Sequence, residues 1–272
     1  FFKQKTAYEM LRSLVGSEMC IRDRAHARMA MQSLSLDDVV IPDSASSSYA
    51  VQDQLISLLA SPQIGWKVGA TGPTSQQKLG VKTPLAGPVF ATTLFSSGAT
   101  VQLTGFHHQP GIESEIAFKI STTLRPGGKP LNAISVREIV SAAYPAIELV
   151  CTRFETNFAV PPALLVADGV AHAGLILGDE VPTNKLGDLS RLAISTLIDG
   201  TEVSSGTGAE VLGDPFESLA WLCNHLSGRG IELPQGSIVT TGACTGINES
   251  QANELVATDA GPLGSVSIHL SE

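Results

Sequence analysis

Two glutamates, one residue apart in an otherwise apolar strand pattern, constrain this chain most. Glu113 and Glu115 belong to residues 112–120, whose alternation of apolar and polar residues is typical of a β-strand. Side chains at positions i and i+2 of a strand share a face, so the two carboxylates point the same way and repel each other. A fold containing this strand must either expose that face to water or place a cation against it.

A third carboxylate, Glu148, lies alone in the apolar segment 145–150. An isolated buried carboxylate is costly unless it is paired or binds a metal. One divalent cation held by Glu113, Glu115 and Glu148 would remove both the repulsion and the cost of burial. Oxygen-only ligands favour Mg²⁺ or Mn²⁺ over Zn²⁺. The alternative is a strand with one wet face, on which Glu113 and Glu115 are solvated.

Composition narrows the classes of partner. The 272 residues are 43% hydrophobic, enough for one sizeable core, and no apolar run approaches the roughly 18 residues that span a bilayer. A net charge of −9 without a basic cluster argues against binding to nucleic acid or to an anionic membrane. The four cysteines lack metal-site or disulfide-scaffold spacing, which predicts reduced thiols in a cytoplasmic protein.

The first 24 residues differ from the rest. They resemble translated sequencing-adapter read-through, and they carry five Lys or Arg residues against three Asp or Glu residues in an otherwise acidic chain. We expect residues 1–24 to be a non-native appended segment and residues 25–272 to form a single domain.

Strand patterns outnumber helical ones along the chain. We expect helices over residues 48–60 and 135–143 and from Asp214-Pro215 onward, with Ser135 and Asp214 as N-caps. Strands are expected over 112–120 and 169–177, among others. No regular alternation of strand and helix and no internal repeat is present, which disfavours doubly wound and barrel folds. The sequence therefore predicts one α+β domain with a mixed sheet.

A set of motifs occurs in a recognisable order along residues 40–272. They include GWKVGA (65–70), IESEIAF (112–118), PAIELV (145–150), VAD (166–168), LGDPFESLAWL (212–222) and GSIVTTGA (236–243). Together they resemble the 2-keto-4-pentenoate hydratase family and the related 4-oxalocrotonate decarboxylases of the fumarylacetoacetate hydrolase superfamily. The resemblance implies a mixed β-roll with a few peripheral helices, homo-oligomeric assembly, and Mg²⁺ or Mn²⁺ held by Glu113, Glu115 and Glu148.

The resemblance also implies an activity. The expected enzyme is a metal-dependent hydratase that adds water to a short unsaturated 2-oxo acid in the catabolism of aromatic compounds. A decarboxylase of 4-oxalocrotonate-type diacids, a hydrolase of acylpyruvates, and a non-catalytic relative that binds 2-oxo acids are the alternatives. Hydratases and decarboxylases of this kind can also associate with each other.

Site residues beyond the glutamates follow from the same motifs. By itself, a lysine such as Lys67 is more typical of a strand edge, where its amine reaches water. The resemblance makes Lys67 the expected catalytic residue, in proton transfer or carboxylate binding. It makes Asp168, Thr241 and Gly242 the expected substrate-binding residues.

Two departures from the family pattern point to a divergent substrate or to a decarboxylase-like subgroup. Residues 82–86 lack an acidic residue that relatives carry, and Gly169 follows Asp168 where relatives usually have asparagine. Three further interpretations concern polar residues nearby. We favour a structural role for His172 and a solvated loop for His107 and His108. We favour a buried thiol for Cys151.

Overall fold

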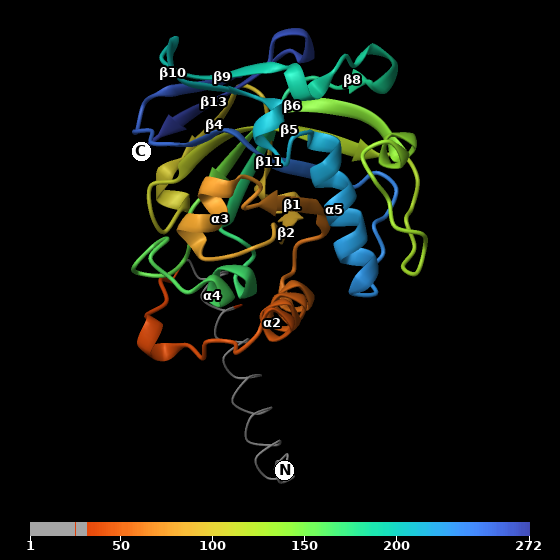
Figure 1. Ribbon diagram of the computed structural model, residues 1–272. Helices are drawn as coiled ribbons and strands as arrows, with labels where there is room; N and C mark the ends of the chain where they lie inside the picture. The colour runs from red at the N-terminus through yellow and green to blue at the C-terminus, as the bar shows by residue number, and fades with distance from the viewer. Residues whose placement is uncertain (1–24, 26–31) are drawn as a thin grey trace.

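The computed structural model describes Ala25 and residues 32–272. The predicted appended segment of residues 1–24 lies outside them, so its nature and the predicted domain boundary stay predictions. Thirteen strands of the described chain form two sheets (Figure 1). Within this described part, every helix is too short or too polar to span a membrane.

The larger sheet carries the acidic strands at its centre. Its order is β2 (Leu85–Phe90), β1 (Gln63–Gly69), β11 (Ile238–Asn248), β5 (Gly111–Ile120), β6 (Val140–Val150), β7 (His172–Leu177) and β3 (Leu94–Ser96), with β8 (Val181–Pro182) paired to β6. The pairs β1–β11 and β3–β7 are parallel and the others are antiparallel. The sheet is therefore mixed, as the sequence predicts.

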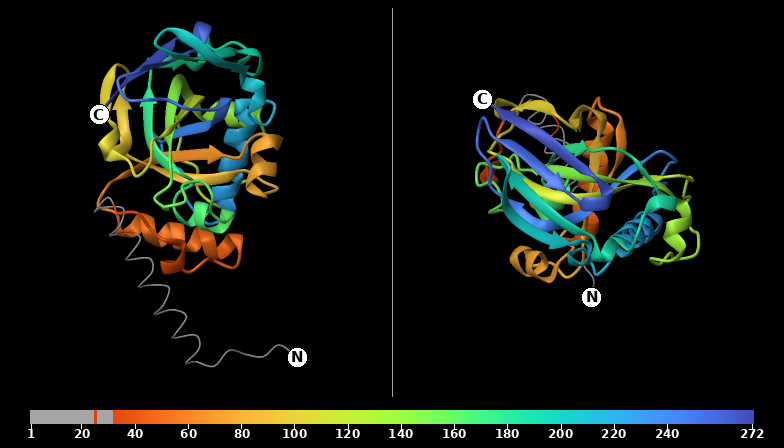
Figure 2. Two further views of the ribbon diagram at one scale, coloured as in Figure 1. Left: turned by 90° about the vertical axis from the view of Figure 1, so that its left-hand side faces the viewer. Right: turned by 90° about the horizontal axis from the view of Figure 1, so that it is seen from above.

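The smaller sheet covers one face of the larger one. Its order is β10 (Thr201–Thr207), β9 (Ala193–Ile198), β12 (Leu255–Asp259), β13 (Ser265–Ser271) and β4 (Ala99–Gln102). In the left-hand view of Figure 2 it lies across the top of the molecule. An apolar cluster joins the two sheets, with Ile112 and Ile147 on one side and Val256 and Ile268 on the other.

Helices are few and lie at the periphery, so the predicted α+β class is confirmed. Within residues 32–272 the α-helices are α2 (Ala45–Leu58), α3 (Pro73–Leu79), α4 (Pro162–Ala167) and α5 (Pro215–Gly228). Helix α5 begins where Asp214 accepts a hydrogen bond from the Phe216 amide at 2.8 Å. Helix α2 is fastened to the domain by Gln52, whose Nε2 donates to the carbonyls of Ala86 (2.9 Å) and Val166 (2.8 Å).

The predicted helix over residues 135–143 is wrong beyond its first turn. Residues Ser135–Ile139 form a 3₁₀-helix, and the chain enters β6 at Val140, which pairs with Ile120 of β5. Ser135 is not the N-cap; instead the Asn132 side chain accepts hydrogen bonds from the amides of Ile134 and Ser135. Pairing with a neighbouring strand outweighs the local helical pattern.

The strand predicted over residues 169–177 begins three residues later than expected. Gly169, Val170 and Ala171 have φ angles of 88°, 57° and 59°, in the left-handed region, and β7 begins at His172. Strand geometry requires a negative φ, so these three residues form a turn that leads out of α4.

Candidate metal centre

Strand register brings the three predicted glutamates together. Glu113 of β5 lies directly opposite Glu148 of β6, and Glu115 follows on the same face of β5. One carboxylate oxygen from each residue lies within 4.8 Å of the others. Glu115 and Glu148 are fully buried and Glu113 is half-buried. The wet-face alternative is therefore wrong for this strand.

A β-bulge in β11 places a backbone amide against one of the glutamates. The register between β11 and β5 shifts between Thr240 and Ala243, and the extra residue directs the Gly242 amide at Glu115 Oε2, 3.0 Å away. Gly242 has φ 116°, and a Cβ there would lie 2.3 Å from Thr71 Oγ1, so only glycine fits. Thr241 Oγ1 donates to the Ile116 carbonyl at 2.9 Å, which pins the bulge to β5.

Lys67 of β1 is the cation that the structure places at this cluster. Its side chain is buried, and Nζ lies 3.3 Å from Glu148 Oε2. The strand-edge alternative, in which the amine reaches water, is wrong. Among the described residues, one lysine faces three carboxylates, so their negative charges outnumber the positive charge at the cluster.

That shortage of positive charge appears in the pKa values. Burial raises the pKa of Glu113 to about 7, with Lys67 opposing the rise and Glu148 adding to it. Burial and the charges of Glu148 and Glu113 raise the pKa of Glu115 well above its usual range. Burial also acts to raise the pKa of Glu148, but Lys67 and His172 outweigh it and lower that pKa. Burial acts to lower the pKa of Lys67, but the three carboxylates together raise it.

The residues present fit a divalent cation. Glu115 Oε1 is buried and accepts no hydrogen bond from any described residue. Leaving such an oxygen unsatisfied is costly, and a bound cation would remove that cost. The donors are all carboxylate oxygens, the ligands that Mg²⁺ and Mn²⁺ prefer.

His172 also belongs to this centre, a place that the sequence pattern did not predict for it. Its Nδ1 lies 2.8 Å from Glu148 Oε1, and its Nε2 lies 3.1 Å from Thr93 Oγ1. The interpretation as an isolated structural histidine is therefore incomplete. The available signal was the departure from the family pattern directly after Asp168.

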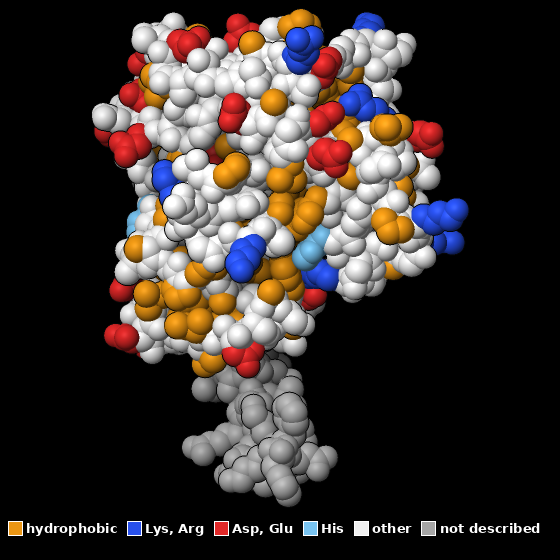
Figure 3. All heavy atoms as spheres, viewed as in Figure 1, with side chains coloured by type: hydrophobic (Ala, Val, Ile, Leu, Met, Phe, Trp, Pro, Cys, Tyr) orange, Lys and Arg blue, Asp and Glu red, His pale blue; other side chains and the backbone are white. Residues whose placement is uncertain are grey.

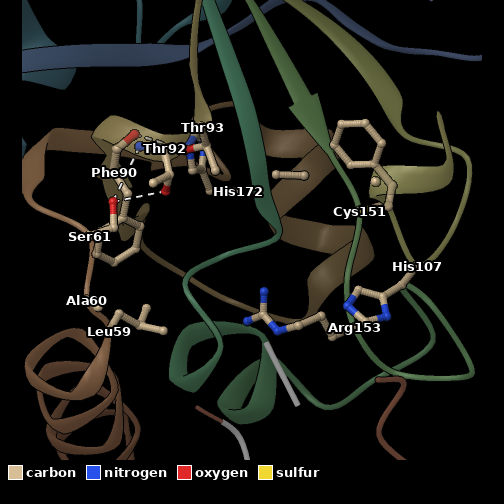
Figure 4. A pocket seen from close by; sticks show the side chains of 13 residues that line it. Leu59, Ala60, Ser61, Phe90, Thr92, Thr93, His107, Cys151, Arg153 and His172 are labelled. Atoms are coloured by element: carbon tan, nitrogen blue, oxygen red, sulfur yellow. Dashed lines mark hydrogen bonds between the residues drawn. The ribbon is translucent and has the colours of Figure 1, made fainter. Parts of the chain in front are cut away.

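Asp168 is engaged elsewhere. Its carboxylate forms an ion pair with Arg153, and Arg153 Nη2 also donates to the Asp168 carbonyl at 2.9 Å. Arg153, His107, Thr93 and His172 line a cavity of about 350 Å³. Figure 4 shows Thr93 and His172 together on one wall of this cavity, with Arg153 and His107 on another. His172 is therefore the residue that links the cavity wall to the glutamates.

Comparison with known proteins connects this geometry to a family. The family model described as fumarylacetoacetate (FAA) hydrolase, C-terminal, matches residues 70–269. The 2-keto-4-pentenoate hydratase of Burkholderia vietnamiensis (strain G4 / LMG 22486) is 30% identical over 234 residues, which are 84% of this chain and 87% of that protein. The 4-oxalocrotonate decarboxylase of Pseudomonas sp. (strain CF600) is 33% identical over 185 residues, 67% of each chain.

A solved structure shares the fold. It is the 4-oxalocrotonate decarboxylase from Pseudomonas putida G7 complexed with magnesium and adipate, which matches with a TM-score of 0.84 and covers 98% of this chain and 100% of that one. The identity is 23%, so this likeness speaks for the fold alone. It confirms the predicted β-roll architecture with few peripheral helices.

Proposed function

This chain belongs to the fumarylacetoacetate hydrolase family, and from that premise we propose that it is a metal-dependent hydratase acting on a short unsaturated 2-oxo acid. The substrate is of the 2-hydroxypenta-2,4-dienoate type, and the product is a 4-hydroxy-2-oxo acid. The observation that carries the proposal is the convergence of three carboxylates beside a buried lysine.

Each residue of the centre has a role in this proposal. Glu113, Glu115 and Glu148 would hold Mg²⁺ or Mn²⁺. When bound, the metal supplies Lewis-acid polarisation of the 2-oxo group. The Gly242 amide orients Glu115, and the Thr241 hydroxyl holds the strand that carries it.

Lys67 is the proposed catalytic residue. Its ammonium group is buried beside Glu148, where it can hold the substrate carboxylate or transfer a proton during the addition of water. Asp168 is part of the proposed substrate-binding set, and we assign its contribution to the positioning of Arg153 at the cavity.

Spectroscopy with the dienoate tests the hydratase proposal. Loss of the ultraviolet absorbance of 2-hydroxypenta-2,4-dienoate should require Mg²⁺ or Mn²⁺ and should disappear in Glu115→Gln. Turnover that persists after complete removal of metal would overturn the proposal.

Decarboxylation is the second candidate, because the 33% identical relative is a 4-oxalocrotonate decarboxylase. Release of CO₂ from 2-oxohex-3-enedioate, with no loss of the dienoate, would favour it over the hydratase. Tight binding of oxalate without turnover of either substrate would instead favour a non-catalytic 2-oxo acid-binding protein.

A homo-oligomer is also part of the proposal. Val40, Ile41 and Leu58 in and near α2 expose 60%, 50% and 42% of their surface. Figure 3 shows apolar side chains gathered at the lower left of this face, where Figure 1 draws α4 and the segment that precedes α2. Burial of such side chains between subunits would stabilise an assembly. Light scattering that gives the mass of one chain at micromolar concentration would contradict it, and co-elution with a hydratase or decarboxylase would reveal a mixed complex.

A further inference from the structure

Two of the three carboxylates of the centre are held in different ways. Glu115 accepts a hydrogen bond from a backbone amide, that of Gly242. Glu148 is held at both oxygens by side chains, with Lys67 Nζ at 3.3 Å from Oε2 and His172 Nδ1 at 2.8 Å from Oε1. The orientation of Glu148 therefore depends on two side chains that can be exchanged individually.

His172 is itself rigidly placed. Its side chain is fully buried, and the hydroxyl of Thr93 lies 3.1 Å from Nε2, on the far side of the ring from Glu148. Because a carboxylate oxygen only accepts, Nδ1 must carry the hydrogen that faces Glu148. The ring is thus held from both ends, with one orientation and a proton on Nδ1.

The backbone before His172 shows that this placement is imposed by the fold. Val170 is β-branched, yet it adopts a left-handed conformation between two other residues with positive φ. Such conformations persist only where the surroundings enforce them, and they concentrate at functional sites. Here the turn is wedged against two glycines: a Cβ at Gly87 would lie 2.4 Å from the Gly169 carbonyl oxygen, and one at Gly69 would lie 3.0 Å from Val170 Cγ1.

From these contacts we infer that His172 is a positioning residue, which fixes the Glu148 carboxylate in the orientation that binds the metal. The inference rests on the proposed function, since it needs a cation at the glutamates. A hydrogen bond from a neighbouring histidine removes rotational freedom from the ligand before the metal arrives. Loss of such partners typically weakens metal binding by about 10- to 100-fold.

Two amide variants, each placing a donor at one of the two ring-nitrogen positions, separate this role from simple filling of space. In His172→Asn the side-chain amide nitrogen can occupy the position of Nδ1, whereas in His172→Gln it reaches toward the position of Nε2. Mn²⁺ affinity, measured by calorimetry and by the electron paramagnetic resonance of free Mn²⁺, should stay within about threefold of wild type in the Asn variant. In the Gln variant it should fall by about 10- to 100-fold. Without metal, the melting temperatures of the Asn and Gln variants should match each other.

Two further variants complete the experiment. His269→Gln changes a histidine of β13 in the other sheet and should leave Mn²⁺ affinity unchanged. Thr93→Val keeps His172 but removes the group at Nε2, and should weaken Mn²⁺ binding by a smaller factor than His172→Gln.

The outcomes are distinct. Equal Mn²⁺ affinity in wild type, the Asn variant and the Gln variant would overturn the inference and leave the proposed function standing. Equal weakening in both variants would also overturn it, because a donor at Nδ1 would then not restore binding. A wild-type protein that binds no Mn²⁺ would overturn the proposed function, and the role of His172 with it.

Discussion

The two faces of strand β5 bury polar side chains in opposite ways. On one face, Glu113 and Glu115 meet Glu148, and Glu115 Oε1 receives no hydrogen bond from the described residues. On the other face, the Ser114 hydroxyl contacts Thr196 Oγ1 at 2.7 Å and Thr258 Oγ1 at 2.6 Å. The paired hydroxyls join the two sheets, while the carboxylate cluster, in which Glu115 Oε1 accepts no hydrogen bond from the described residues, lies where a cation can bind.

This difference separates structural from functional burial. A fully paired buried group stabilises the fold, and its loss costs stability. A cluster of like charges costs stability until a ligand arrives, so its loss costs function instead. Changes on the two faces should therefore affect different observables.

The largest effect is expected for Glu115→Gln. It removes one of the three carboxylate ligands of the metal. We expect the activation barrier to rise by several kcal/mol, so that metal-dependent turnover falls on the order of a thousandfold. Without metal, the variant should be at least as stable as wild type at neutral pH, because burial and the neighbouring carboxylates, which raise the pKa of Glu115, oppose folding there and an amide does not titrate. Urea denaturation and dienoate turnover measure the two effects. A metal-free variant clearly less stable than wild type would contradict the contrast between the faces.

The next effect concerns the ligand itself. Mg²⁺ at one hundred times its dissociation constant should stabilise the wild-type fold by about 2.7 kcal/mol, since it binds the folded state alone. Denaturation midpoints with Mg²⁺ and with EDTA measure this gain. Glu115→Gln should show little of it, and Ser114→Ala should retain it. A similar gain in all three proteins would mean that Mg²⁺ binds elsewhere.

Ser114→Ala removes the hydroxyl contacts on the opposite face of β5. It leaves two buried threonine hydroxyls with one partner fewer, so the free energy of unfolding should fall by about 2 kcal/mol. Metal affinity should not change. Adding Thr258→Val should cost less than the sum of the two single changes, because both residues belong to one network. Strict additivity would show that the network does not act as a unit.

The smallest effect is pH-dependent and lies away from β5. His225 stacks on Trp221 at 4.9 Å between ring centroids, and burial, aided by the charge of Arg229, lowers its pKa to about 4. Between pH 6.5 and 4, the His225 imidazole is protonated in the unfolded chain before it is protonated in the folded one, so the free energy of unfolding falls as pH falls. The loss should be about 1 kcal/mol, because the ring is partly exposed.

His225→Phe isolates that effect. It keeps an aromatic ring against Trp221 and Tyr49 but removes the titration. The difference in free energy of unfolding between wild type and variant should be constant above pH 7. As the pH falls toward 4.5, wild type should lose stability relative to the variant. Parallel stability curves over this range would contradict the lowered pKa of His225.

The elements that the sequence predicts well are those that depend on local chemistry. Asp214 followed by Pro215 marks the start of α5 because a capping carboxylate and a fixed φ favour a first helical turn at that point. Local chemistry also explains the turn at Asp199-Gly200, which joins β9 to β10 because both residues adopt positive φ. Residues 135–143 failed because partner strands far along the chain decide their conformation.

The sequence by itself determined that Glu113 and Glu115 share one face, since the two-residue period of a strand requires it. It also carried the family motifs that point to a metal and to Lys67. Only the tertiary structure decided that Glu148 lies opposite Glu113, that a bulge turns Gly242 toward Glu115, and that a left-handed turn delivers His172 to Glu148. These contacts join residues distant in the chain, and local periodicity contains no information on which strands pair or in which register.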